Sequence, residues 1–260
     1  MMQTEFLKNY FPPYLWNNPA QKKYIIKEYI QLLILDYLST TKYINKIVFI
    51  GGTNLRLTKG TDRFSEGLDF DCKKLSDEDF IEMTDDIIQF LQRFGFRTET
   101  RDQPNDKLKA FRRNIFFPEL LFELGLSGYR QERFLIKIES QDQQIDYKHK
   151  LETIKGCGLY FKFPVPTDEI MCAMKISALL SRQKGRDFYD VMFLMEQTKP
   201  DYSFLSARCG IKNQEQLKHA LKDMLQKIDL SHKAKDFEHL AFQEQKSRRI
   251  LLFADFVDDL

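Results

Sequence analysis

The chain has 260 residues, of which 43% are hydrophobic and 30% are charged, so it is long enough to bury the core of one large domain or two small ones. Its aromatic content of 13%, with 23 phenylalanines, argues against intrinsic disorder. The 40 lysines and arginines nearly balance the 38 aspartates and glutamates. A net charge of +2 gives no general nucleic-acid signature and leaves only local basic patches open.

The cysteines and histidines show no metal-binding spacing: no C-x-x-C pair and no H-E-x-x-H motif occurs. The widely separated cysteines fit a reducing compartment. No apolar run approaches the ~18 residues that span a bilayer, and the N-terminus lacks a basic start followed by an apolar core. We therefore expect no membrane span, no signal peptide and a cytoplasmic location.

The first elements along the chain surround a pair of glycines. Residues 1–19, rich in aromatic residues and proline, predict a docking arm or a short helix. Apolar residues at helical spacing predict a helix over 20–39, and the β-branched run 46–50 predicts a buried strand. Gly51-Gly52-Thr53 follows at once and precedes a helix. A strand, paired glycines and a helix can together present backbone N–H groups to phosphate.

Further strands are predicted over 68–72, 96–101, 111–117 and 134–139. A helix between the first two begins after Ser76, which has Asp79 three residues later, and ends at Gly95.

The chain changes character at Pro164 and Pro166. The later helices are predicted over 168–181, 186–197, 214–227 and 246–258. We therefore expect an α+β fold: a domain over 1–163 with a mixed sheet of about five strands and helices, and a helical C-terminal domain over 164–260.

Paired carboxylates are the sharpest chemical feature. Side chains alternate along a strand, so Asp69 and Asp71 share one face. Two adjacent carboxylates repel each other, and such a pair suits Mg²⁺, which prefers a few carboxylates plus substrate phosphates. A surface strand with two solvated aspartates is the alternative. The glycine turn upstream favours the metal site. Glu139, on the alternating strand 134–139, either supplies a third carboxylate or lies on a solvated face.

A second cluster lies in the helical half, around the tight turn at Gly185. Lys175 could neutralise phosphate charge, and Asp190 could orient a base or a positive partner. The alternative is a helical hairpin whose arginines and aspartates form a structural ion-pair network, and spacing alone favours this alternative. Arg186 and Asp187 flank the turn, where Asp187 could cap the second helix.

Two motifs resemble those of the AbiEii/AbiGii-type nucleotidyltransferases, toxins of bacterial toxin–antitoxin and phage-defence systems. The first pattern, G-G-T-x-L-x-L followed by R-[FL]-S-x-D-L-D-F, corresponds to residues 51–57 and 63–70. The second, K-x-x-A-[LI]-x-x-R-x-x-x-R-D-x-x-D, corresponds to residues 175–190. The resemblance implies a DNA-polymerase-β-like catalytic half and a helical second half, with nucleotide in the cleft between them.

The resemblance also implies a reaction: transfer of a nucleoside monophosphate from an NTP, with pyrophosphate leaving. In related toxins the acceptor is the 3′ end of tRNA, and a cognate antitoxin protein is the expected partner. By similarity, Mg²⁺ ions would act as a two-metal clamp. The implied metal ligands are Asp69, Asp71 and Glu139. The implied catalytic residues are Asp69, Asp71, Lys175 and Asp190. The implied nucleotide-binding residues are Gly51, Gly52, Thr53, Arg63, Ser65 and Lys175.

The chain departs from the family pattern at Gly67, where the family usually has aspartate. Positions 67, 69 and 71 share a strand face, so the metal pair could be 67/69 or 69/71. The basic run 107–113 (KLKAFRR) is the candidate RNA-binding surface, or a solvated strand edge. Two other functions stay open: nucleotidyl transfer to a small molecule, and a non-catalytic partner-binding protein with a degenerate site.

Overall fold

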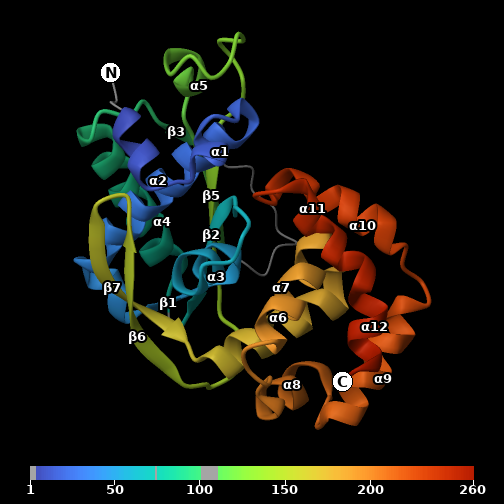
Figure 1. The fold of residues 1–260 in the computed structure, drawn as a ribbon. Coiled ribbons are helices and arrows are strands. Elements are labelled where there is room, and N and C mark those ends of the chain that lie inside the picture. The colour runs from blue at the N-terminus through green and yellow to red at the C-terminus, as the bar shows by residue number, and fades with distance from the viewer. Residues whose placement is uncertain (1–3, 74, 101–110) are drawn as a thin grey trace. The chain divides into compact units, whose positions relative to one another are not determined.

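The computed structural model describes residues 4–73, 75–100 and 111–260, and the chain forms two compact units (Figure 1). We call them the sheet unit and the helical unit. The sheet unit comprises Met1–Gly60, Phe64–Gln143 and Leu151–Val165. The helical unit comprises Thr61–Arg63, Gln144–Lys150 and Pro166–Leu260. A domain boundary after residue 163 stays a prediction. In the described part of the chain, no helix combines the length and apolar character needed to cross a membrane.

The sheet unit contains both helices and strands. In chain order its elements are η1 (Glu5–Asn9), α1 (Pro13–Trp16), α2 (Pro19–Ser39), η2 (Lys42–Asn45), β1 (Ile47–Ile50), α3 (Gly51–Lys59), β2 (Gly67–Cys72), α4 (Asp77–Arg93), β3 (Glu99–Thr100), β4 (Phe111–Phe116), α5 (Leu120–Glu123), β5 (Leu135–Gln141), β6 (His149–Gly156) and β7 (Leu159–Pro166), where η denotes a 3-10 helix.

Strands β1 to β5 form one mixed sheet in the order β1-β2-β5-β4-β3. Strands β2 and β5 run parallel, and the other neighbours pair antiparallel. The register places Ile50 opposite Asp69, Asp69 opposite Glu139, and Glu139 opposite Arg112. Because directly opposed residues point to the same face, these side chains form a row across the sheet.

The opposite face of the sheet is apolar. Leu68, Phe70, Ile136 and Ile138 are at most 1% exposed on that face. Helix α4 packs against β4 there, with the Phe80 and Phe111 rings stacked at 5.3 Å between centroids. Burial of this face holds the sheet in one register, because a slip by one residue would turn the apolar side chains toward water.

The helical unit contains short helices only. They are α6 (Asp168–Arg182), α7 (Gly185–Met195), α8 (Tyr202–Cys209), α9 (Gln214–Leu225), α10 (Leu230–Phe237), η3 (Glu238–Leu240), α11 (Glu244–Ser247), η4 (Arg248–Leu252) and α12 (Phe253–Asp258). The rings of Phe188 on α7 and Phe253 on α12 meet edge to face at 4.9 Å between centroids, which joins two elements far apart in the sequence.

The structure confirms the α+β class and most of the predicted elements. The helices at 20–39 and 168–181, the strand at 46–50 and the helix that follows it all form. Helix α4 begins with the predicted capping box. In it the Asp79 N–H donates to the Ser76 Oγ at 3.1 Å, and the Ser76 N–H donates back to the Asp79 carboxylate at 3.3 Å.

Two predicted elements were wrong in extent. In the described part of 96–101, only Glu99–Thr100 forms a strand. Phe96 instead closes helix α4 through its N–H to the Leu91 carbonyl at 3.0 Å and packs its ring against the core. The predicted helix over 246–258 is broken into α11, η4 and α12, because the chain tightens into a 3-10 helix over Arg248–Leu252.

The hairpin of β6 and β7 is a feature that the sequence analysis missed. The two strands pair only with each other, joined by Cys157 and Gly158, whose φ angles are 52° and 85°. Two consecutive positive φ angles are typical of the type I′ turn. Phe163 on β7 contacts Phe49 and Phe70 of the main sheet, so the hairpin closes the core of the sheet unit.

Candidate active site

The glycine turn places a carboxylate at the start of a helix. Gly51 is the first residue of α3 and has a φ of +82°, in the left-handed region that favours glycine. A Cβ at this position would lie 2.2 Å from the Oδ2 atom of Asp69. The Asp69 carboxylate therefore lies directly against the first turn of α3. Ile50, at the N-cap position, has no polar side chain to cap the N–H groups of that turn.

Side chains of α3 fasten this helix to the sheet. The Thr53 hydroxyl donates to the Gly67 carbonyl at 2.5 Å, and the Asn54 amide donates to the Phe49 carbonyl at 2.6 Å. Thr53 is buried, so its hydroxyl holds β2 in place, and its backbone N–H is the group left for a phosphate role. The Ser65 carbonyl accepts from the Gln31 amide at 3.2 Å, which fixes the segment that leads into β2.

Asp71 lies deeper than Asp69. It is 1% exposed, and its Oδ1 atom accepts the Gln143 backbone N–H at 2.9 Å. Asp69 is half-buried on the same strand face. Two hard oxygen donors side by side suit one Mg²⁺ ion, and the free space that Gly51 leaves above Asp69 suits a phosphate approaching the helix.

Glu139 is already paired with two cations. Arg112 Nε donates to its Oε1 atom at 2.6 Å, and Lys137 Nζ lies 2.7 Å from its Oε2 atom. Burial raises the pKa of Glu139, but Lys137 and Arg112 outweigh it and hold that pKa below its usual value. Among residues 4–73, 75–100 and 111–260, no group of three or more His, Cys, Asp or Glu side chains is placed to hold a metal.

We call Asp69, Glu139 and Arg112 together with Lys137 the polar row. The sequence analysis singled out the two carboxylates of this row but missed Lys137. Its signal lies in the register, because Lys137 pairs with Gly67 on β2, the position that departs from the family pattern.

The helical unit holds a second cluster, the buried triad of Arg63, Lys175 and Asp190. Arg63 Nε and Nη2 donate to the two Asp190 carboxylate oxygens, each at 2.6 Å. Lys175 Nζ donates to Asp190 Oδ2 at 2.8 Å. Arg63 and Asp190 are 0% exposed and Lys175 is 4% exposed. The structure thus brings three predicted site residues together, around one carboxylate.

Burial and charge act in opposite directions on the triad. Burial raises the pKa of Asp190, but Arg63 and Lys175 outweigh it and lower that pKa to about 2. Burial lowers the pKa of Lys175, against the opposing effect of Asp190. Two cations and one anion give the triad a net charge of +1, so one buried positive charge has no counterpart within the triad.

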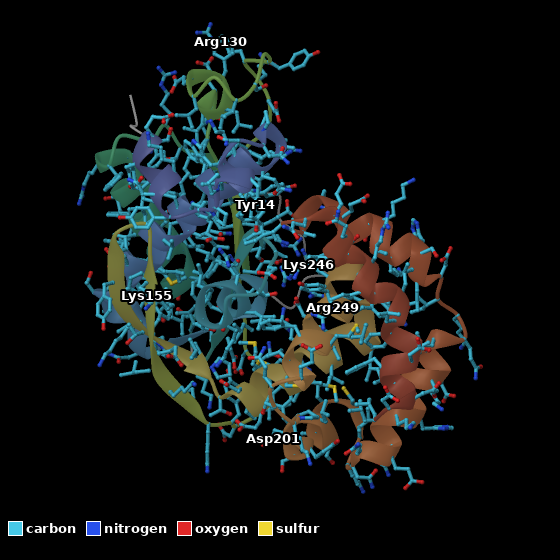
Figure 2. The ribbon with its side chains drawn as sticks, viewed as in Figure 1. Tyr14, Arg130, Lys155, Asp201, Lys246 and Arg249 are labelled. Atoms are coloured by element: carbon cyan, nitrogen blue, oxygen red, sulfur yellow. The ribbon has the colours of Figure 1, made fainter. Side chains whose placement is uncertain are left out.

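The segment Thr61–Arg63 is held in the helical unit by neighbouring contacts. The Phe242 N–H donates to the Asp62 carbonyl at 3.1 Å, and Arg63 forms a β-bridge with Ala241. Lys246, labelled in Figure 2, forms an ion pair with Asp62 at 3.2 Å. These contacts fix the backbone from which Arg63 reaches Asp190.

The turn between α6 and α7 is a cap, as one reading of the sequence predicted. Asp187 is buried and accepts the Lys184 N–H at 3.1 Å. Arg182, rather than Arg186, donates to both Asp187 oxygens, at 2.9 and 2.7 Å.

Replacing Asp187 with alanine should therefore lower the free energy of unfolding by about 1–2 kcal/mol, the usual range for a lost cap. Urea unfolding of the variant measures this loss. The matched control is Asp201→Ala, because Asp201 caps α8 through the Phe204 N–H and should cost about 1 kcal/mol. A loss of activity with unchanged stability would contradict the structural role of Asp187.

The described part of the basic run is engaged in ion pairs. Arg112 pairs with Glu139, and Arg113 Nη2 lies 2.6 Å from Asp85 Oδ1. Lys107 and Lys109 lie outside the described residues. The prediction of an RNA-binding surface at 107–113 is therefore not tested by these arginines.

The chain matches the family model described as "Nucleotidyl transferase AbiEii toxin, Type IV TA system" over residues 33–256. No curated protein matches the chain significantly.

Solved structures share the fold at low sequence identity. MenT4, a nucleotidyltransferase toxin from Mycobacterium tuberculosis H37Rv, is 16% identical with a TM-score of 0.64, covering 100% of this chain and 91% of its own. JHP933 from Helicobacter pylori is 19% identical with a TM-score of 0.53, covering 92% and 93%. A putative nucleotidyltransferase from H. pylori is 18% identical with a TM-score of 0.52, covering 90% and 94%.

Proposed function

Because the chain belongs to the family of AbiEii nucleotidyl transferase toxins of type IV toxin–antitoxin systems, we propose that it transfers a nucleoside monophosphate from an NTP to the 3′ end of tRNA in an Mg²⁺-dependent reaction. The observation that supports this most is the Asp69 carboxylate lying against Gly51 at the start of α3. The helix start suits the phosphates, and the carboxylate suits the cation that accompanies them.

The residue roles follow from chemistry. Asp69, with Asp71 beside it, holds Mg²⁺, which neutralises charge on the phosphates and the leaving pyrophosphate. The backbone N–H groups of Gly51, Gly52 and Thr53 bind the triphosphate, and Ser65 lies in the loop that leads to β2. Glu139 orders the polar row through Arg112 and Lys137. Arg63 fixes the Asp190 carboxylate, which in turn orients Lys175.

Lys175 carries the positive charge that the triad does not balance, and we assign it to phosphate neutralisation during transfer. A buried, unbalanced cation is more costly to a fold than a neutral side chain, and such perturbed groups cluster at functional sites. A cognate antitoxin and a cytoplasmic location, where NTP and tRNA meet, complete this proposal.

Replacing Lys175 with methionine tests that assignment. The Arg63–Asp190 pair survives, so the free energy of unfolding should change by less than about 1 kcal/mol. Transfer of label from NTP should fall by at least about tenfold, because a phosphate-neutralising charge is lost. A variant that unfolds readily but transfers label at the wild-type rate would make Lys175 structural.

The proposed function is tested with each labelled NTP, Mg²⁺ and total tRNA, by following where the label appears. We expect label at the RNA 3′ end with one preferred NTP. Asp69→Asn keeps the shape and removes the charge, so it should reduce the rate by at least about 10²-fold while the protein stays folded. Label that never reaches RNA, or full activity in Asp69→Asn, contradicts the proposal.

A small-molecule acceptor is the second candidate, since the net charge is only +2 and both described arginines of the basic run are used in ion pairs. Neutralising Lys109, Arg112 and Arg113 separates the two. An RNA enzyme should lose roughly one unit of salt-dependence slope per phosphate contact removed, and a small-molecule enzyme should show no RNA binding to lose.

A further inference from the structure

The polar row carries its own fixed positive charge. Arg112 occupies the Oε1 atom of Glu139 and Lys137 occupies the Oε2 atom, at 2.5 and 2.7 Å. Charge-assisted hydrogen bonds of this kind are short and strong. A divalent ion placed beside Glu139 would either lie next to two positive groups or have to displace one of them.

Lys137 lies in space that Gly67 leaves open. The two residues are opposite each other in the parallel pair of β2 and β5. A Cβ on Gly67 would lie 3.0 Å from the Lys137 carbonyl oxygen, 3.7 Å from its Cβ and 3.8 Å from its Cε. The Lys137 stem therefore runs along Gly67, and its ammonium group reaches Glu139 from there. A larger side chain at position 67 would crowd the lysine.

The missing carboxylate and the added cation change the charge of this sheet face in the same direction. Asp69, Asp71 and Glu139 contribute three negative charges, and Arg112 and Lys137 contribute two positive ones, which leaves a net −1. An aspartate at position 67 would make the net charge −2. The face as it stands holds enough uncompensated charge for one divalent ion and repels a second.

We propose that the Lys137 ammonium group replaces a second divalent cation, so that the site binds NTP with a single metal ion. This inference rests on the proposed nucleotidyl transfer and adds its metal count. Lys137 is then a fixed charge that stays in place through binding and release, and Gly67 is the substitution that makes room for it.

The direct test counts bound Mn²⁺ by electron paramagnetic resonance, with the full-length protein and a non-hydrolysable NTP analogue. We expect one Mn²⁺ per chain at saturation. Two Mn²⁺ per chain would overturn the inference and leave the proposed function standing. A protein that binds no analogue at any Mn²⁺ concentration would overturn both.

Lys137→Met separates a charge role from a packing role. Without the ammonium group, analogue affinity at low Mn²⁺ should fall by at least about tenfold, and high Mn²⁺ should restore it as a second ion binds near Glu139. A merely structural lysine would not be rescued by metal. The matched control is Lys155→Met, because Lys155 is exposed on β6 of the same unit (Figure 2) and should bind as wild type.

Gly67→Asp tests the other half of the inference. It should raise the count to two Mn²⁺ per chain, because the face becomes more negative. Its close contact with the Lys137 backbone can hinder folding, so thermal melting is checked first. If Gly67→Asp does not fold, the Lys137→Met result decides: unchanged affinity, or a loss that Mn²⁺ does not restore, overturns the inference.

Discussion

Replacing Asp190 with asparagine is expected to lower the free energy of unfolding by about 3–5 kcal/mol. Asparagine keeps the shape of the side chain but removes its charge. Arg63 and Lys175 then lie buried with no counter-charge in the triad, and Asp190 is the group that both cations contact at 2.6–2.8 Å. Urea unfolding monitored by circular dichroism measures the loss.

The control for this variant is Asp258→Asn. Asp258 also pairs with a lysine, at 2.6 Å from Lys222, but this pair is exposed. Its removal should leave unfolding unchanged within error, because exposed ion pairs contribute little. Adding Lys175→Met to Asp190→Asn should recover part of the loss, since one of the two unbalanced cations is gone. If Asp190→Asn is as stable as wild type yet inactive, Asp190 serves catalysis alone.

The triad also shows what sequence reasoning could not reach. Arg63 and Asp190 are 127 residues apart, and no local pattern relates them. Spacing within 175–190 favoured a structural ion-pair network there, and the resemblance favoured a functional role. The structure combines these readings, because the network exists and also contains Lys175 as a surplus cation.

Elements with strong local signals were predictable. The strand before Gly51 is a short β-branched run between turn residues, and α4 has a capping box, so both are encoded by neighbouring residues. The β6–β7 hairpin was missed because Cys157 takes a positive φ that is unusual for its residue type, and because Pro164 and Pro166 were read as a boundary. Proline is tolerated where a strand needs no further partner.

The candidate site was predictable only in part for a similar reason. Alternation along β2 places Asp69 and Asp71 on one face from sequence alone. The pairing of Glu139 with Asp69, and of Lys137 with Gly67, depends on the parallel register of β2 and β5. Register is set by burial of the apolar face, which involves residues from several strands at once.

The second large effect is expected for Gly51→Ala. The substitution should reduce nucleotidyl transfer by at least about 10²-fold, to the level of Asp69→Asn. An alanine Cβ would lie 2.2 Å from Asp69 Oδ2, so the carboxylate or the first turn of α3 has to move. Either movement separates the metal-binding carboxylate from the N–H groups that we assign to the triphosphate. Initial rates with the preferred labelled NTP measure the loss.

The opposite end of the same helix supplies a matched control for backbone strain. Gly60, the C-cap of α3, has a φ of +71°, and a Cβ there would meet no atom within 4 Å. Gly60→Ala should therefore cost about 1 kcal/mol of stability through its left-handed conformation, with the transfer rate unchanged. Gly51→Ala carries the same conformational cost and adds the collision with Asp69. Equal rates in the two variants would show that the contact between Gly51 and Asp69 has no part in catalysis.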